Sequence, residues 1–117
     1  MTDNEIENRM NEIYHRVYQG GVRVGNYDLF TEAEKRELDE LYCRRMIISC
    51  LVYTPSNFYN ERTKEFGYYA QDYIKKLGEE RALELFNEQK ERMASAKIYR
   101  CAGYDSEGNC YSSVDWN

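Results

Sequence analysis

The chain has 117 residues, of which 42% are apolar and 32% are charged, and its net charge at pH 7 is −5. This composition excludes a disordered chain, and a chain of this length buries roughly two thirds of the surface that its unfolded form exposes. Residues 1–117 can therefore fold as a single domain without a disulfide or a metal to stabilise it. The sequence pI of about 5.0 argues against direct binding of nucleic acid, because domains that bind it usually have a pI above roughly 9.

The sequence shows neither a membrane span nor a secretion signal. Its longest apolar run, residues 46–53, is far shorter than the ~20 residues that a membrane-spanning helix needs. The first residues are acidic, whereas a signal peptide begins with basic residues followed by an apolar stretch. We therefore expect a cytoplasmic protein without a membrane partner, and in that compartment cysteines stay reduced by default.

The first helix is expected over residues 3–19. Thr2 and Glu5 have the spacing of a capping box, in which two side chains satisfy backbone N–H groups at the start of a helix. Gly20 and Gly21 then end the helix, and residues 22–24 alternate as a short strand would. One stripe of residues, three or four positions apart, should face the core: Ile6, Met10, Ile13, Tyr14, Val17 and Tyr18.

The second helix is expected over residues 32–53, and Thr31 with Glu34 forms a clearer capping box at its start. Its second half is apolar on nearly all sides, which is typical of a helix that passes through the middle of a domain. Pro55 prevents the helix from continuing. The residues of its first half that should face inward are Leu38, Leu41 and Tyr42.

Two further helices are predicted, over residues 61–77 and 79–96, the first of them capped by Asn60 or a neighbouring residue. Gly78 suits the junction between them, because glycine readily adopts the backbone conformation that ends many helices. The junction is so short that these helices should lie antiparallel or cross sharply. The inward stripes are Phe66, Tyr69, Ala70, Tyr73, Ile74 and Leu77 in the first helix, and Ala82, Leu85, Phe86, Gln89 and Met93 in the second.

Alternation of side chains beyond residue 97 predicts a β-hairpin over residues 98–114. Gly108 suits the left-handed position of a type I turn followed by a bulge. The register that this turn implies sets Cys110 opposite Tyr104 and Cys101 opposite Ser113.

The elements together predict the α+β class: a single α-rich domain of about four helices with a C-terminal β-hairpin. An isolated hairpin is only marginally stable in water, so this one should pack on the helices or form a small sheet with residues 22–24.

The sequence offers little for catalysis. His15 is the only histidine, and no local pattern brings a nucleophile and a carboxylate to it. The motifs of Gly-rich phosphate-binding loops, of zinc proteases and of serine hydrolases are all absent from the sequence. We therefore expect a protein that is not an enzyme, with no catalytic residue and no cofactor.

Four cysteines leave a structural zinc site open as an alternative. Zinc sites usually take their ligands in close pairs, and neither spacing between these cysteines has that form. Free thiols and no metal site are therefore the favoured interpretation. If zinc is bound, the chain would be a zinc-stabilised adaptor whose ligands are Cys43, Cys50, Cys101 and Cys110.

The net negative charge comes from the first third of the chain, because residues 1–40 hold ten acidic and five basic residues. Acids three or four positions apart on a helix lie ~5–6 Å from one another, which is close to the spacing of successive phosphates. Such a face could occupy the basic, nucleic-acid-binding surface of a partner protein. The acids predicted to contact the partner are Glu32, Glu34, Glu37, Asp39 and Glu40.

The chain is rich in tyrosine, with twelve of them, and about half fall on the helix stripes. Those outside the stripes are candidates for exposed aromatic residues, Tyr99 among them. Aromatic side chains dominate the binding energy of many protein interfaces. The aromatic residues predicted to anchor a partner are Tyr59, Tyr68, Tyr104, Tyr111 and Trp116.

These features favour a small, acidic, non-catalytic binding protein that occupies a partner protein's surface. In size and composition the chain resembles inhibitors encoded by phages and other mobile elements, anti-CRISPR proteins among them. The resemblance rests on no motif residues, so it transfers no functional residue to this chain. The alternative is a protein that binds or sequesters a nucleotide-like ligand by tyrosine stacking and through Arg44, Arg45 or Arg100.

Overall fold

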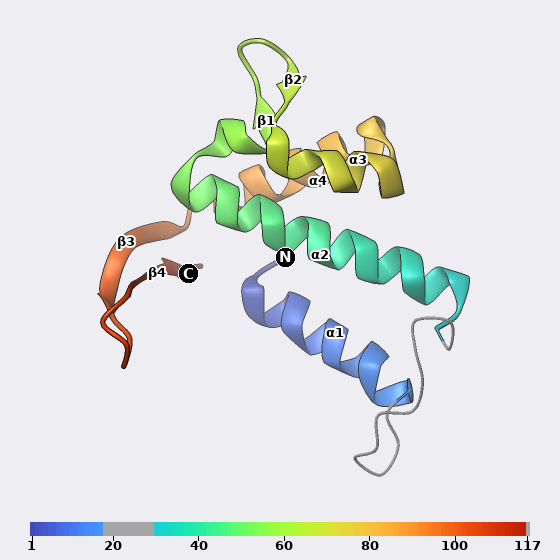
Figure 1. Ribbon diagram of the computed structural model, residues 1–117, viewed down its shortest axis with the longest axis horizontal. Helices are drawn as coiled ribbons and strands as arrows, with labels where there is room; N and C mark the ends of the chain where they lie inside the picture. The colour runs from blue at the N-terminus through green and yellow to red at the C-terminus, as the bar shows by residue number, and fades with distance from the viewer. Residues whose placement is uncertain (18–29, 117) are drawn as a thin grey trace.

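The computed structural model describes residues 1–17 and 30–116, the side chains of residues 101 and 102 excepted. These residues form four α-helices, named α1 (Asp3–Val17), α2 (Glu32–Tyr53), α3 (Gln71–Leu77) and α4 (Glu79–Met93), and two antiparallel hairpins (Figure 1). The predicted α+β class is confirmed. Residues 18–19 at the end of the expected first helix and the expected strand 22–24 lie outside the described residues.

Helix α2 is the centre of the fold, with α1 on one side of it and α3 and α4 on the other (Figure 1). Leu41 and Ile48 pack with the buried stripe of α1 in one apolar cluster. Ile47 packs with buried residues of α3 and α4 in a second cluster. Because α2 buries two opposite sides, its second half is apolar nearly all round, as the sequence predicts.

Both predicted capping boxes are present. At α2 the backbone N–H of Glu34 donates to Thr31 Oγ1 at 3.1 Å, and Glu34 Oε1 accepts from the N–H of Thr31 at 2.8 Å. Thr2 and Glu5 make the same reciprocal pair at 3.2 Å at the start of α1. Two residues three positions apart are sufficient for this motif, so both helix starts follow from local sequence.

The expected helix over residues 61–77 is wrong in its first half, because α3 begins only at Gln71. The preceding residues form a short hairpin of β1 (Tyr59–Asn60) and β2 (Glu65–Phe66), followed by the 3-10 helix η3 (Tyr68–Ala70). Asn60 does not cap a helix; its side-chain Oδ1 accepts the backbone N–H groups of Arg62 and Thr63, at 3.0 and 3.3 Å. Asparagine competes with helix formation through such local bonds, and they close a turn here.

Helix α4 carries the buried stripe that the sequence predicts, and it ends at Met93 rather than at residue 96. Gly78 has a φ of 89°, and its N–H bonds the carbonyl of Ile74, so it ends α3 and leads directly into α4. The fully buried Gln89 donates from Nε2 to the carbonyl of Met1 at 2.9 Å and accepts at Oε1 from the amino group of Met1 at 2.6 Å. These bonds hold the start of α1 against α4.

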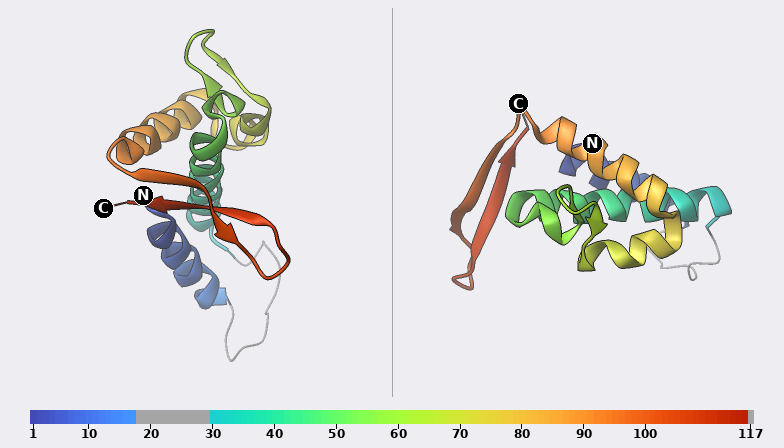
Figure 2. Two further views of the ribbon diagram at one scale, coloured as in Figure 1. Left: turned by 90° about the vertical axis from the view of Figure 1, so that its left-hand side faces the viewer. Right: turned by 90° about the horizontal axis from the view of Figure 1, so that it is seen from above.

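The second hairpin consists of β3 (Lys97–Tyr104) and β4 (Cys110–Asp115), and it lies beyond the C-terminal end of α2 (Figure 2). Gly108 has a φ of 84°, and its N–H bonds the carbonyl of Asp105 at 3.1 Å, as expected for the predicted turn.

The predicted hairpin register is right at the turn and wrong further along. Cys110 lies opposite Tyr104, but Ser113 lies opposite Tyr99 instead of Cys101. An irregularity between Tyr99 and Gly103 places additional residues of β3 against β4 and shifts the register. The alternation in the sequence does not reveal such an insertion.

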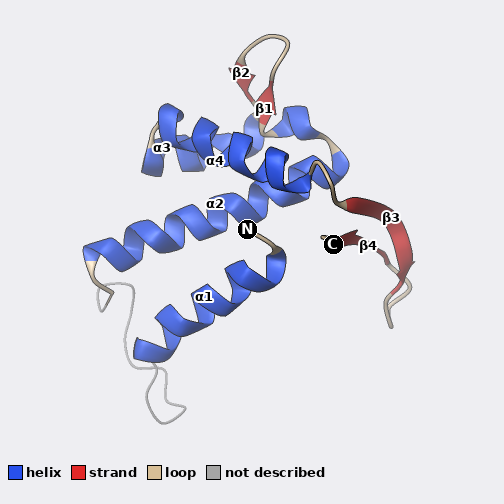
Figure 3. Cartoon of the chain, turned by 180° about the vertical axis from the view of Figure 1, so that it is seen from behind, coloured by secondary structure: helices blue, strands red, loops and turns tan. Residues whose placement is uncertain are grey.

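The strands lie at the margins of a helical body (Figure 3). Within the part of the chain that the structure describes, no helix has the length and apolar character needed to cross a membrane.

Candidate interaction surface

The acidic residues predicted to contact a partner all lie in ion pairs within the protein. Arg16 and Arg9 of α1 bond Glu34 and Glu37, the Nε atoms lying 2.6 and 2.5 Å from the nearest carboxylate oxygens. Lys76 of α3 lies 3.8 Å from Asp39, and Arg81 of α4 donates to Glu40 at 2.7 Å. Lys35 pairs with Glu32 at 3.1 Å within α2. The acids of α2 therefore connect it to each of the other helices.

Two of these contacts favour the ionised form of their carboxylates, those of Glu34 and Glu40. Hydrogen bonds from Arg16 and the N–H of Thr31 lower the pKa of Glu34 to about 2. Partial burial raises the pKa of Glu40, but the hydrogen bond and charge of Arg81 outweigh burial, so this pKa lies below its ordinary value. Exposed pairs of this kind each stabilise a protein by no more than about 1 kcal/mol. Their clearest consequence is that the α2 acids already have counter-charges.

The structure separates the predicted aromatic anchors into two groups. Tyr68, Tyr104 and Tyr111 are exposed, with 85%, 72% and 49% of their surface accessible. Tyr59 is partly buried, and its ring centre lies 4.9 Å from that of Phe66. Trp116 also packs on the core, where the guanidinium of Arg92 lies 5.3 Å from its ring centre. Three of the five anchors are therefore available at the surface.

Several tyrosines are more exposed than the helix pattern predicts. Tyr42 and Tyr69 were expected to face the core, but both are exposed. Tyr42 lies at the edge of its stripe, where its hydroxyl bonds that of Tyr14 at 2.7 Å. Tyr53, which sequence reasoning missed as a surface residue, is 55% exposed at the end of α2. In the sequence, the one signal for this exposure is that Tyr53 is the last residue of the expected helix.

The outer face of the β3–β4 hairpin carries two of the exposed tyrosines. Tyr99 pairs with Ser113, and Tyr111 lies two residues from Ser113 on the same side of β4. Gly103 lies opposite Tyr111, and a Cβ atom there would approach the Tyr111 hydroxyl to 2.6 Å. The ring of Tyr111 therefore lies over the backbone of Gly103, and a Cβ atom at this position would displace the ring. Tyr104 is exposed beside the turn.

The hairpin is attached to the C-terminal end of α2. Arg100 donates from Nε to the carbonyl of Val52 at 2.8 Å and from Nη2 to that of Tyr53 at 3.4 Å. The hydroxyls of Tyr53 and Ser112 also share a hydrogen bond. The last turn of α2 contains no basic residue, so Arg100 provides the positive charge that unpaired carbonyls at a helix end favour. These contacts hold the strands of the hairpin against the end of α2 at Arg100 and Ser112.

Two of the three arginines proposed to bind a nucleotide-like ligand have structural contacts. Arg100 binds the end of α2, and Arg44 lies 3.7 Å from Glu88. Arg45 instead lines a cleft of about 470 Å³ between α2 and the hairpin, together with Tyr53 and Tyr111. Nucleotide binding stays a prediction, with Arg45 the arginine best placed for it.

The cysteines lie in different parts of the fold. Cys43 and Cys50 belong to the second core cluster, Cys110 is exposed on the hairpin, and the side chain of Cys101 lies outside the described residues. Burial raises the pKa of the Cys43 thiol to about 12 and also raises that of Cys50, so neither favours the thiolate that binds zinc. Among the described side chains, no three of the types that bind metals are grouped to hold an ion.

The fold and this surface define a small α+β domain with a paired acidic helix and an exposed aromatic hairpin. No protein-family model matches the chain, and neither a search of curated proteins nor a search of solved structures found a match. A functional proposal therefore depends on the geometry and the composition of the chain itself.

Proposed function

We propose that this chain is a non-catalytic binding protein and that the β3–β4 hairpin docks on a partner protein. The observation that supports the proposal most directly is the exposure of Tyr99, Tyr104 and Tyr111 on one hairpin. Tyrosine presents a large apolar ring with a polar tip, and few rotamers are lost when it is buried at an interface. Three such side chains on one hairpin are typical of the aromatic anchors of a binding site.

The attachment of the hairpin adds to this argument. Arg100 and Tyr53 connect the hairpin to the end of α2, so the strands that carry its tyrosines are positioned before binding. Ordering side chains and loops at an interface reduces affinity, and a preorganised surface avoids part of that cost. The hairpin is therefore better suited to binding than an equally aromatic flexible segment would be.

The acidic residues would act through the net charge of the protein rather than by direct contact. Their ion pairs make them poor candidates for direct contact, but pairing leaves the net charge of the protein at −5. That charge attracts a basic partner surface, such as one that binds nucleic acid, and accelerates encounter. Blocking of such a surface, as an inhibitor of the phage type would do, is the finer form of the proposal and rests on size, composition and charge.

The experiment is affinity capture from a cell lysate with the wild type and two matched double variants. Y99S/Y111S removes two hairpin anchors, while the control Y68S/Y69S removes two exposed tyrosines from η3. Loss of two anchors should lower the yield of the specifically captured protein at least about tenfold, and the control should retain it. Circular dichroism spectra of both variants, compared with that of the wild type, are the control for folding. Equal capture by Y99S/Y111S and wild type contradicts docking through the hairpin.

The electrostatic part is tested separately with the captured partner once purified. Association of opposite charges slows steeply as salt increases, because mobile ions screen the attraction. An association rate that is independent of salt would exclude steering by charge and would leave docking through the hairpin unaffected.

A further inference from the structure

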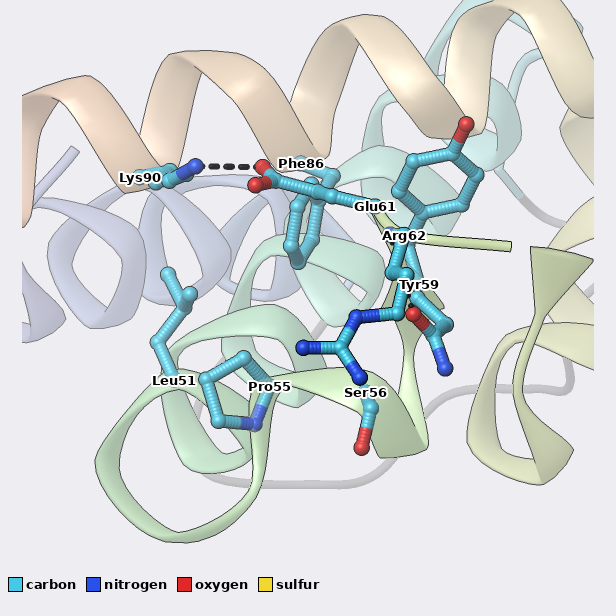
Figure 4. Close-up of a pocket in the computed structure, with 9 residues that line it drawn as sticks. Leu51, Pro55, Ser56, Tyr59, Glu61, Arg62, Phe86 and Lys90 are labelled. Atoms are coloured by element: carbon cyan, nitrogen blue, oxygen red, sulfur yellow. Dashed lines mark hydrogen bonds and ion pairs between the residues drawn. The ribbon is translucent and has the colours of Figure 1, made fainter. Parts of the chain in front are cut away.

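A second cleft lies between the end of α2, the β1–β2 turn and α4, and no residue of the β3–β4 hairpin lines it (Figure 4). Its volume is about 410 Å³, within the range of ~300–1,000 Å³ that is typical of small-molecule sites. The residues that line the cleft include Leu51, Pro55, Ser56, Glu61, Arg62 and Lys90.

The floor of the cleft is apolar and firmly packed. The ring of Phe86 is almost completely buried and stacks parallel to that of Phe58, with 5.8 Å between the ring centres. Tyr59 contacts Phe86 from the side, its ring centre 5.6 Å away. Leu51 and Pro55 add an aliphatic wall. An apolar ligand of about one ring would displace water here without requiring the core to rearrange.

The charged groups at the rim leave one positive charge in excess. Lys90 and Glu61 form an ion pair with each other, so their charges cancel. Arg62 makes no ion pair with any residue of the described ranges, and Figure 4 shows its guanidinium directed across the cleft toward Leu51 and Pro55. The turn that carries Arg62 is held by its N–H bond to Asn60 Oδ1 at 3.0 Å. The site thus combines one free guanidinium with an apolar wall.

We propose that this cleft binds a small organic acid: one carboxylate on an aromatic or branched apolar body. The fork of donors on an arginine matches the two oxygens of a carboxylate, which gives short, charge-assisted hydrogen bonds. One carboxylate neutralises the single uncompensated positive charge, whereas a phosphate dianion would leave a negative charge unpaired in the cleft. The apolar body would lie against Leu51 and Pro55, over the Phe86 floor. The site is separate from the hairpin and does not depend on the proposed partner binding.

The test compares phenylacetate with its uncharged amide, phenylacetamide, by NMR titration of the isotope-labelled protein. Phenylacetate should shift the amide signals of Ser56, Arg62 and Lys90 saturably, and phenylacetamide should bind at least about tenfold more weakly, because it lacks the charge that Arg62 recognises. Absence of saturable shifts at millimolar phenylacetate, or equal binding of acid and amide, overturns the proposal.

Two variants assign the binding to the cleft. R62Q should bind phenylacetate about tenfold more weakly, because glutamine keeps a polar side chain but loses the charge. R45Q is the matched control, since Arg45 lies in the other cleft and should not affect binding. Arg62 is exposed in a turn, so the spectrum of R62Q should show the same fold. Unchanged affinity in R62Q, or an equal loss in R45Q, contradicts the assigned site.

Discussion

The hairpins β1–β2 and β3–β4 both carry aromatic side chains, but they direct them to different environments. In β1–β2, Tyr59 and Phe66 lie opposite each other and pack on the second core cluster, where Tyr59 contacts Phe86 of α4. In β3–β4, Tyr104 and Tyr111 are exposed. The sequence alone places Tyr59, Tyr104 and Tyr111 in one class, that of aromatics outside the helix stripes. The presence of a neighbouring apolar surface, rather than the alternation of residues along a strand, therefore decides which aromatic rings are buried.

The backbone of the two hairpins differs in the same way. Gly67 follows β2 and lies so close to η2 (Pro55–Asn57) that a Cβ atom would approach the carbonyl oxygen of Asn57 to 2.1 Å. Gly103 in β3 is also crowded, but by the far end of the Tyr111 side chain rather than by backbone. The first hairpin is therefore a packed part of the body, while the second contacts the body mainly through Arg100, Tyr53 and Val114.

The largest expected effect is that of a methyl group at these two glycines. G67A must displace backbone and should lower the free energy of unfolding by about 3 kcal/mol. G103A only needs the Tyr111 ring to move, so it should cost less than about 1 kcal/mol. Urea denaturation of both variants measures the difference. Equal destabilisation would mean that the two hairpins are packed to the same degree, and the comparison would fail.

Truncation of one tyrosine in each hairpin should have a smaller effect. Y59A removes a ring that contacts Phe66 and Phe86, and we expect a loss of about 2 kcal/mol in the free energy of unfolding. Y104A removes a ring that is 72% exposed and should change stability by less than about 0.5 kcal/mol. Thermal and urea denaturation at constant pH provide both values. A loss in Y104A as large as that in Y59A would show that the second hairpin is also part of the core.

The smallest expected change in stability comes from the α2 acids, which, like Tyr59, make their contacts within the protein. The pKa of Glu34 is about 2 in the folded chain and near 4.5 when unperturbed, so its ionisation stabilises the fold above pH 4.5. This contribution is lost as the pH falls from 4.5 toward 2. E34Q should therefore be less stable than the wild type near neutral pH, and the two should converge in acid. Glutamine can still form the capping box, so the variant isolates the charge.

The control for this measurement is E32Q, because Glu32 has a 91% exposed side chain and its one ion pair within residues 1–17 and 30–116 is with Lys35, three residues away. Its melting temperature should follow that of the wild type at every pH. A constant difference between E34Q and wild type across the whole pH range would contradict the role of the Arg16–Glu34 pair.

Much of the fold could be predicted because its signals are local. Thr31 with Glu34, Gly78 and Gly108 each act over a few residues, and each lies where the sequence predicts. The error at residues 61–70 has a local cause as well. An asparagine such as Asn60 can either cap a helix or close a turn with its own side chain, and the local sequence is similar in both cases. Here its side chain closes a turn, and the packing of Tyr59 on Phe86 favours that turn.

The candidate site was less predictable. Most of the basic residues that pair with the α2 acids lie many positions away, as Arg9 does from Glu37, and only the pairs within α2, such as Lys35 with Glu32, have a helical spacing. The contact of Arg100 with the end of α2 and the position of Arg62 at the cleft are likewise products of chain segments meeting in space. Counting charges along the sequence therefore predicts an acidic helix face without partners, whereas in the folded protein these acids form ion pairs.

The bounds of α2, the buried residues of α4 and the turn of the C-terminal hairpin could be predicted, because they depend on periodicity and on neighbours a few residues apart. The exposure of the tyrosines, the pairing of most charges and the alignment of the β3 and β4 strands could not, because contacts between distant segments set them. These properties depend on surfaces that distant segments contribute. A tyrosine in particular is stable both in a core and in water, so its environment, more than its chemistry, selects its role.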